Sequence, residues 1–103
     1  MLKYYRDVSR TAIDTGVFQA IADPTRRQIL DELVIRDGLT LFEICGRLTM
    51  LHGVVSSRQA ISQHLAVLEA ADLVRARRVG RTKIHHLNTE PLRAVVDRWP
   101  ITQ

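Results

Sequence analysis

Cysteine is nearly absent from the chain, which carries one thiol, Cys45, in 103 residues. A single cysteine cannot form an intrachain disulfide, and this fits a reducing cytoplasm. Long hydrophobic runs are also missing, because no apolar stretch approaches the roughly 20 residues that span a bilayer. The opening run MLKYYRDVSR mixes charges with Tyr4 and Tyr5, and it lacks the apolar middle of a signal peptide. We therefore expect a cytoplasmic protein with no membrane partner.

Recognisable catalytic groupings are missing as well. No Ser/His/Asp or Cys/His pattern is evident, and the acidic residues lack the spacing of a carboxylate pair. The chain also has no internal repeat, low-complexity tract or linker. Its 46% of apolar and 25% of charged residues are ordinary for a folded globular protein. The sequence thus predicts one domain over residues 1–103, with no enzymatic activity and no cofactor.

What the chain does contain is a concentrated basic segment. Residues 56–88 hold six basic side chains and two acidic ones, whereas the two charge types balance in both flanks. The net charge of +4 therefore lies on this segment. The six basic residues are Arg58, Arg75, Arg77, Arg78, Arg81 and Lys83. Such a distribution is typical of a protein that reads duplex nucleic acid, although charge alone does not separate DNA from RNA or from an acidic membrane.

Local signals predict where the helices begin. Apolar residues at 17, 18 and 21 indicate a short first helix, and Asp23 followed by Pro24 predicts the cap of a second one. Thr40 and Glu43 have the spacing of a capping box, so a third helix should run to about residues 48–51. After a loop at residues 52–55, a second capping-box pattern begins at Ser56.

The helix expected over residues 56–71 has two chemically different faces. Ile61, Leu65 and Leu68 recur at helical spacing and predict a buried stripe. The opposite face carries Gln59, Ser62, Gln63 and Ala66, with Arg58 at its flank. This face has no acidic residue in its first two turns, which suits an element that enters a DNA groove. An ordinary solvated surface is the alternative interpretation.

The remaining pattern predicts a hairpin and a last helix. Strands at residues 73–79 and 82–88 flank a two-residue turn that begins with Gly80. The arginines here either contact nucleic acid or protect an exposed strand edge from pairing. A helix then starts near Pro91 and ends at Pro100. The element order ααααββα predicts a mainly α protein with a small β-hairpin (α+β), a winged helix-turn-helix.

Two runs of sequence resemble the arsenic-repressor (ArsR) family of bacterial winged-helix transcriptional regulators. The run ADPTRRQIL at residues 22–30 is similar to the family's ADPTRRxIL motif. The run SSRQAISQHLAVLEAADLVRARRVGR at residues 56–81 resembles its recognition helix and wing. The resemblance spans about residues 15–99 and implies a homodimer that binds a pseudo-palindromic operator in double-stranded DNA and represses transcription.

The resemblance also assigns roles to residues. The predicted DNA contacts from the reading helix are Ser57, Arg58, Gln59, Ser62 and Gln63, among which Arg and Gln suit bidentate contacts to guanine or adenine. The predicted phosphate or minor-groove contacts from the wing are Arg78, Arg81 and Lys83. Arg75 and Arg77 are weaker candidates, because strand alternation turns some of these side chains away.

The first and last helices are implied to form the dimer interface. The expected interface residues are Phe18, Leu92, Val95, Val96 and Trp99. Their apolar stripes exceed what a small core needs, so a helix from a second chain would bury them. The alternative is that these helices fold back on their own core.

The sequence departs from the family's metal sites. One such site uses two cysteines two positions apart, but here Arg47 follows Cys45 at that spacing. The last helix lacks histidine, and His85 and His86 should point to opposite faces of a strand. We therefore expect no metal, and we interpret Cys45 as a small buried apolar residue, with a redox-reactive thiol as the alternative. His64 is expected to pack between helices rather than to contact DNA.

A second departure is the connection at residues 49–55, which is about six residues longer than the short turn usual in the family. It could extend the preceding helix, cover the core or meet a ligand or the DNA backbone. The function predicted best is a DNA-binding repressor. The alternatives are a winged-helix protein-interaction module and a regulator that responds to a ligand or to oxidation of Cys45. The sequence does not identify an effector.

Overall fold

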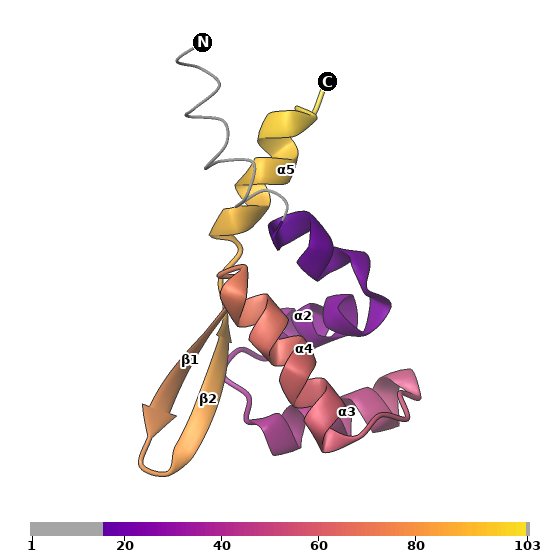
Figure 1. The fold of residues 1–103 in the computed structure, drawn as a ribbon, viewed down its shortest axis with the longest axis vertical. Coiled ribbons are helices and arrows are strands. Elements are labelled where there is room, and N and C mark those ends of the chain that lie inside the picture. Colours follow the sequence, from indigo (N-terminus) through magenta and orange to yellow (C-terminus); the bar gives the residue numbers. More distant parts are fainter. Residues whose placement is uncertain (1–15, 103) are drawn as a thin grey trace.

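The computed structural model describes residues 16–102, so Tyr4 and Tyr5 lie outside the described part of the chain. Residues 16–22 are helical. The helices that follow are α2 (Pro24–Ile35), α3 (Leu41–His52) and α4 (Arg58–Ala70). Next come strands β1 (Val74–Val79) and β2 (Thr82–Leu87), the 3-10 turn η1 (Glu90–Leu92) and helix α5 (Arg93–Arg98). This order confirms the predicted winged helix-turn-helix (Figure 1).

The core forms where α2, α3 and α4 meet. Each helix contributes buried apolar side chains, which in α4 form the predicted stripe, and the first residues of the hairpin close one side. Burial removes each of these side chains from water and supplies about 1.5–3 kcal/mol per large aliphatic group before entropy is counted. The buried members are Ala20, Ile29, Leu33, Leu39, Ile44, Leu48, Ile61, Leu65, Leu68, Leu73 and Val74.

The helix starts follow the predicted caps, with one correction. Both bonds of the Thr40 capping box are present: Thr40 Oγ1 accepts from the Glu43 N–H at 3.1 Å, and the Thr40 N–H donates to Glu43 Oε1 at 2.9 Å. The predicted cap at Ser56 is wrong by one residue, because the Ala60 N–H donates to Ser57 Oγ at 3.1 Å. Ser57 therefore has the extended backbone of an N-cap, and Ser56 belongs to the loop.

The long connection extends α3 by almost a turn. Gly53 ends the helix in the left-handed region, at φ +64°, and the Val54 N–H then donates to Leu48 O at 3.1 Å. Val54 packs against the core. The inserted residue His52 also contacts α2, because its Nε2 lies 2.9 Å from Oε2 of the buried Glu32. The connection thus lengthens α3 and covers the core, two of the three roles considered for it.

The wing is an antiparallel hairpin that projects away from the helices (Figure 1). Its turn begins at Gly80, the position predicted from the sequence, and the φ of +64° there lies in the left-handed region that glycine adopts readily. Its base is held by Leu39, which exchanges two backbone hydrogen bonds with His85, at 3.1 and 2.8 Å. The anchored base fixes the direction in which the hairpin leaves the core.

The helical segment 16–22 and α5 lie side by side at the end of the molecule opposite the wing (Figure 1). The Phe18 and Trp99 rings meet edge to face at 5.8 Å, and the Arg98 guanidinium lies over both rings. Trp99 nevertheless keeps 62% of its surface exposed, and Val96 keeps 44%. Among residues 16–102, no helix combines the length and apolar character that a membrane crossing needs.

Candidate nucleic-acid interface

Helix α4 presents the polar face that the sequence predicted. Ile61, Leu65 and Leu68 are buried, and the other residues of the helix are exposed except for the half-buried Ala60, His64 and Glu69. The exposed residues on this surface include Ser57, Arg58, Gln59, Ser62, Gln63 and Ala66. None of them is acidic, and the amide and guanidinium groups among them can each form paired hydrogen bonds with a base edge.

Strand register sorts the basic residues of the wing into two faces. Arg78 lies directly opposite Lys83, and Ala76 lies opposite His85, so these residues share one face. Arg75 and Arg77 point to the other face. Arg75 is also engaged by Asp72, to which it donates two hydrogen bonds of 3.0 Å. This bidentate pair lowers the pKa of the Asp72 carboxyl.

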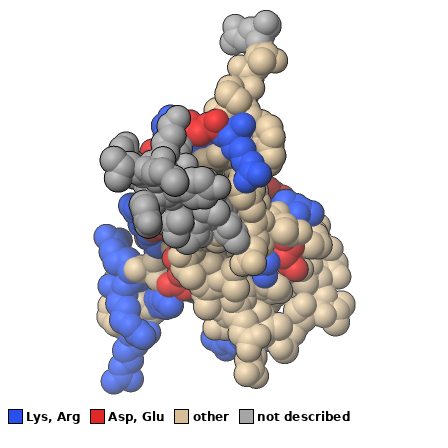
Figure 2. Space-filling view, turned by 45° about the horizontal axis from the view of Figure 1, so that its top comes forward, with Lys and Arg blue, Asp and Glu red and all other residues tan. Residues whose placement is uncertain are grey.

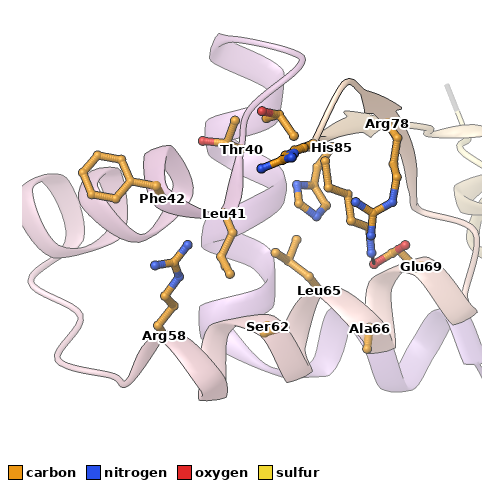
Figure 3. Close-up of a pocket in the computed structure, with 13 residues that line it drawn as sticks. Thr40, Leu41, Phe42, Arg58, Ser62, Leu65, Ala66, Glu69, Arg78 and His85 are labelled. Carbon is orange, nitrogen blue, oxygen red and sulfur yellow. Dashed lines mark hydrogen bonds and ion pairs between the residues drawn. The ribbon is translucent and has the colours of Figure 1, made fainter.

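A cleft of about 580 Å³ separates α4 from the wing (Figure 3). Arg58 and Ser62 line it from α4, and Arg78, Arg81 and Lys83 line it from the hairpin. Ser57, Gln59 and Gln63 lie outside the cleft, on the outward surface of the same helix. The fold therefore brings two of the predicted helix residues, Arg58 and Ser62, to the same concave surface as the three predicted wing residues.

The charge of this surface is largely positive. Figure 2 shows lysine and arginine side chains gathered along the hairpin. Arg78 and Lys83 are like charges at directly opposed positions, an arrangement that destabilises a hairpin unless an anion lies between or beside them. Glu69 of α4 offsets part of this charge, because Lys83 Nζ lies 3.4 Å from Glu69 Oε2. A phosphate backbone would supply the missing negative charge.

Several cleft residues were not foreseen from the sequence, and Phe42 and Glu69 are the two that change its chemistry most. Phe42, near the start of α3, lines the cleft and is 75% exposed, and Arg58 extends toward it (Figure 3). The signal for Phe42 was its position outside the buried stripe of α3, which includes Ile44 and Leu48. Glu69 gave no signal, since its ion pair with Lys83 depends on how the hairpin packs against α4.

The histidines have structural partners. His64 accepts a hydrogen bond from Arg26, as expected of a helix-packing residue. His85 is buried and its Nδ1 donates to Leu39 O at 2.9 Å, whereas Nδ1 of His86 lies 3.0 Å from Asp37 Oδ2. Within residues 16–102, no group of three or more His, Cys, Asp or Glu side chains is arranged to hold a metal ion.

Cys45 is half-buried and packs against the core. Burial raises the pKa of its thiol, although the nearby positive charge of Arg58 acts in the opposite direction. A raised pKa lowers the fraction of thiolate, the form that reacts with oxidants. The structure therefore favours the interpretation of Cys45 as an apolar packing residue over that of a redox-reactive thiol.

Comparison with known proteins agrees with this architecture. A family model described as a helix-turn-helix domain matches residues 21–77. The chain is 45% identical over 84 residues to the HTH-type transcriptional regulator YuzN of Bacillus subtilis, a match that covers 82% of this chain and 91% of YuzN. It is 38% identical over 77 residues to the transcriptional repressor SdpR of the same organism, covering 75% of this chain and 78% of SdpR.

Solved structures extend the comparison to the fold. An ArsR-like transcriptional regulator from Rhodococcus sp. RHA1 superimposes with a TM-score of 0.71 and 31% sequence identity, covering 87% of this chain and 81% of that one. The matched family model spans the helices of the core and the start of the wing. The chain therefore belongs to the ArsR-like family of winged helix-turn-helix proteins, and it is a DNA-binding transcriptional regulator rather than an enzyme.

Proposed function

We propose that the chain is a homodimeric repressor that reads a pseudo-palindromic operator. In this proposal α4 enters the major groove and selects the sequence through Arg58, Gln59, Ser62 and Gln63, assisted by Ser57 at the helix start. The wing residues Arg78, Arg81 and Lys83 hold the phosphate backbone, where charge contributes affinity without sequence preference. SdpR, a relative named as a transcriptional repressor, supports the direction of regulation.

The cleft between α4 and the wing carries the proposal. It places hydrogen-bonding side chains of a helix and cations of a hairpin on one concave surface. A protein-interaction module would need no such combination, because its contacts are largely apolar at the centre of the interface. A surface that unites base-reading groups with an excess of positive charge fits duplex DNA best.

The exposed apolar surface of the terminal helices supports a dimer. Val96 and Trp99 are exposed, and Ile101 is 78% exposed. Leu92 and Val95 are half-buried, and Phe18 packs on Trp99. A second copy of this surface, related by a twofold axis, would bury these side chains and place two α4 helices on one face of the DNA.

Duplex binding measured against salt tests the proposal. Sequences that the protein retains from a random duplex library should share two inverted half-sites, and sedimentation should show two chains per duplex. Arg78 and Arg81 give four wing cations per dimer, and Lys83, which is paired with Glu69, adds up to two more, so log affinity should fall linearly with log salt at a slope between about −3.6 and −5.4. A shallow dependence on salt, or no retained duplex, would contradict the proposal and favour a protein-interaction module.

A further inference from the structure

Arg26 connects the first helical segment to α4. Its Nε donates to Ala20 O and its Nη2 to Gln19 O, both at 2.8 Å, so two carbonyls at the end of the segment 16–22 are satisfied. Its Nη1 donates to Nδ1 of His64 at 3.1 Å. One guanidinium thus uses all three nitrogens to join two elements that are far apart in sequence.

This geometry determines the protonation state of His64. A guanidinium carries only donors, so Nδ1 of His64 must be the acceptor and the ring must be neutral, with its proton on Nε2. The carboxylate of Asp23 lies 3.9 Å from the same Nδ1 and accepts from the backbone N–H of Arg26. Among residues 16–102, the charged groups that face this ring are Arg26 and Asp23, both at the start of α2; no charged group of α3, of the hairpin or of α4 itself contacts it.

The connection reaches α4 beside the proposed reading surface. His64 directly follows Ser62 and Gln63 on α4, and the segment that Arg26 holds includes Phe18, which packs on Trp99. A change in the Arg26–His64 contact would therefore alter the orientation of the reading helix relative to the terminal helices.

We propose that Arg26 and His64 are positioning residues, which orient α4 relative to the first helical segment so that its polar face meets the bases correctly. They act through α4 and touch no DNA. This inference rests on the proposed function, since it concerns how well a duplex sequence is discriminated.

The tautomer of His64 is the first test, and it needs no DNA. Nitrogen NMR of the free protein near pH 7.5 should show an unprotonated Nδ1 and a protonated Nε2. A protonated Nδ1 would overturn the proposal, whatever the protein binds.

Paired variants are the second test. His64→Asn keeps an acceptor near the position of Nδ1, whereas His64→Leu removes it. We expect His64→Leu to lose about tenfold in the ratio of selected to scrambled duplex affinity, the size of one charge-assisted hydrogen bond. His64→Asn should retain most of that ratio, and both variants should keep the wild-type salt slope. Equal loss in the two variants would contradict the inference.

Arg27 provides the matched control. Its Nη1 donates to Ile21 O at 2.7 Å, so it also binds the end of the first segment. Within the described residues, however, Arg27 makes no hydrogen bond or ion pair with α4. Arg26→Lys should reduce discrimination, because the three acceptors are bound by three separate nitrogens of a planar guanidinium and the single nitrogen of lysine does not reproduce that geometry. Arg27→Lys should leave discrimination unchanged. Thermal melts of both variants identify any general loss of fold, and equal effects on discrimination at equal stability would refute the assignment.

If the wild type binds no duplex at all, the proposed function fails. If the wild type binds normally and the Arg26 and His64 variants discriminate between duplexes as well as it does, only this inference is overturned.

Discussion

Removing the acidic group from the cleft should tighten DNA binding. Glu69 lines the cleft and holds Lys83 at 3.4 Å, so its carboxylate competes with phosphate for that ammonium. In the variant Glu69→Gln the ammonium is released, and the side chain keeps its size. The ion pair is partly solvated, with 46% of the lysine and 29% of the glutamate side chain exposed, so its loss should cost at most about 1 kcal/mol of stability.

The magnitude follows from counterion release. One additional phosphate contact per subunit adds up to about 0.9 to the salt slope, or up to about 1.8 for a dimer. Between 50 and 200 mM salt, the affinity advantage of Glu69→Gln should then shrink by up to about twelvefold. Because the contact is to phosphate, the gain at low salt should be similar for selected and scrambled duplexes.

Fluorescence anisotropy titrations at several salt concentrations measure both quantities. Asp72→Asn is the matched control, because it removes the same charge but releases Arg75, which lies on the other face of the wing. Asparagine also tolerates the left-handed backbone at this position, where φ is +59°. An unchanged slope in Glu69→Gln, or an equal change in Asp72→Asn, would refute the assignment of the cleft as the phosphate site.

Three further predictions concern the reading helix, the dimer and the buried ion pair. Arg58→Ala should cost about 1–3 kcal/mol on a selected duplex and relax the preference at one base pair, as measured by competition with single-site substitutions; an unaffected preference would exclude a base contact. Val96→Asp should raise the dimer dissociation constant by at least about thirtyfold, because a charge buried in an interface is costly. The melting temperature of the monomer should change little, because Val96 is 44% exposed within one chain. Sedimentation that still shows a stable dimer would contradict the proposed interface. The contacts of His52 and Arg47 lower the pKa of Glu32, so its contribution to the free energy of unfolding is present above about pH 4.5 and is lost as the pH falls below that value. Glu32→Gln should therefore destabilise the protein by about 1–3 kcal/mol at pH 7 and by less at pH 3.5, as measured by urea unfolding; an equal loss at both pH values would show that the charge is irrelevant.

Local signals in the sequence predicted most of the secondary structure. The Asp23 and Thr40 caps and the glycine turn of the wing depend on residues a few positions apart, so the sequence contains them directly. The start of α4 was predicted one residue too early, because two adjacent serines can each cap a helix. Local sequence does not distinguish between them, and the path of the preceding loop places Ser57 at the cap.

The cleft could be predicted only in part. Alternation along the strands separated Arg78 and Lys83 from Arg75, and the helical period exposed the polar face of α4. The side chains that pair with the residues of the cleft and of α4 come from other helices or strands. The contacts between Glu69 and Lys83 and between Arg26 and His64 depend on how whole elements cross, which no local spacing specifies.

The most direct test of the central claim is a map of backbone amide NMR shifts as a selected duplex is added. If α4 and the wing form one DNA interface, the largest changes should fall on residues 57–66 and 78–83, on both sides of the cleft. The far side of the hairpin, represented by Arg75 and Arg77, should change little. Changes confined to the wing, or centred on α2, would contradict the account, because the polar face of α4 would then not read the DNA.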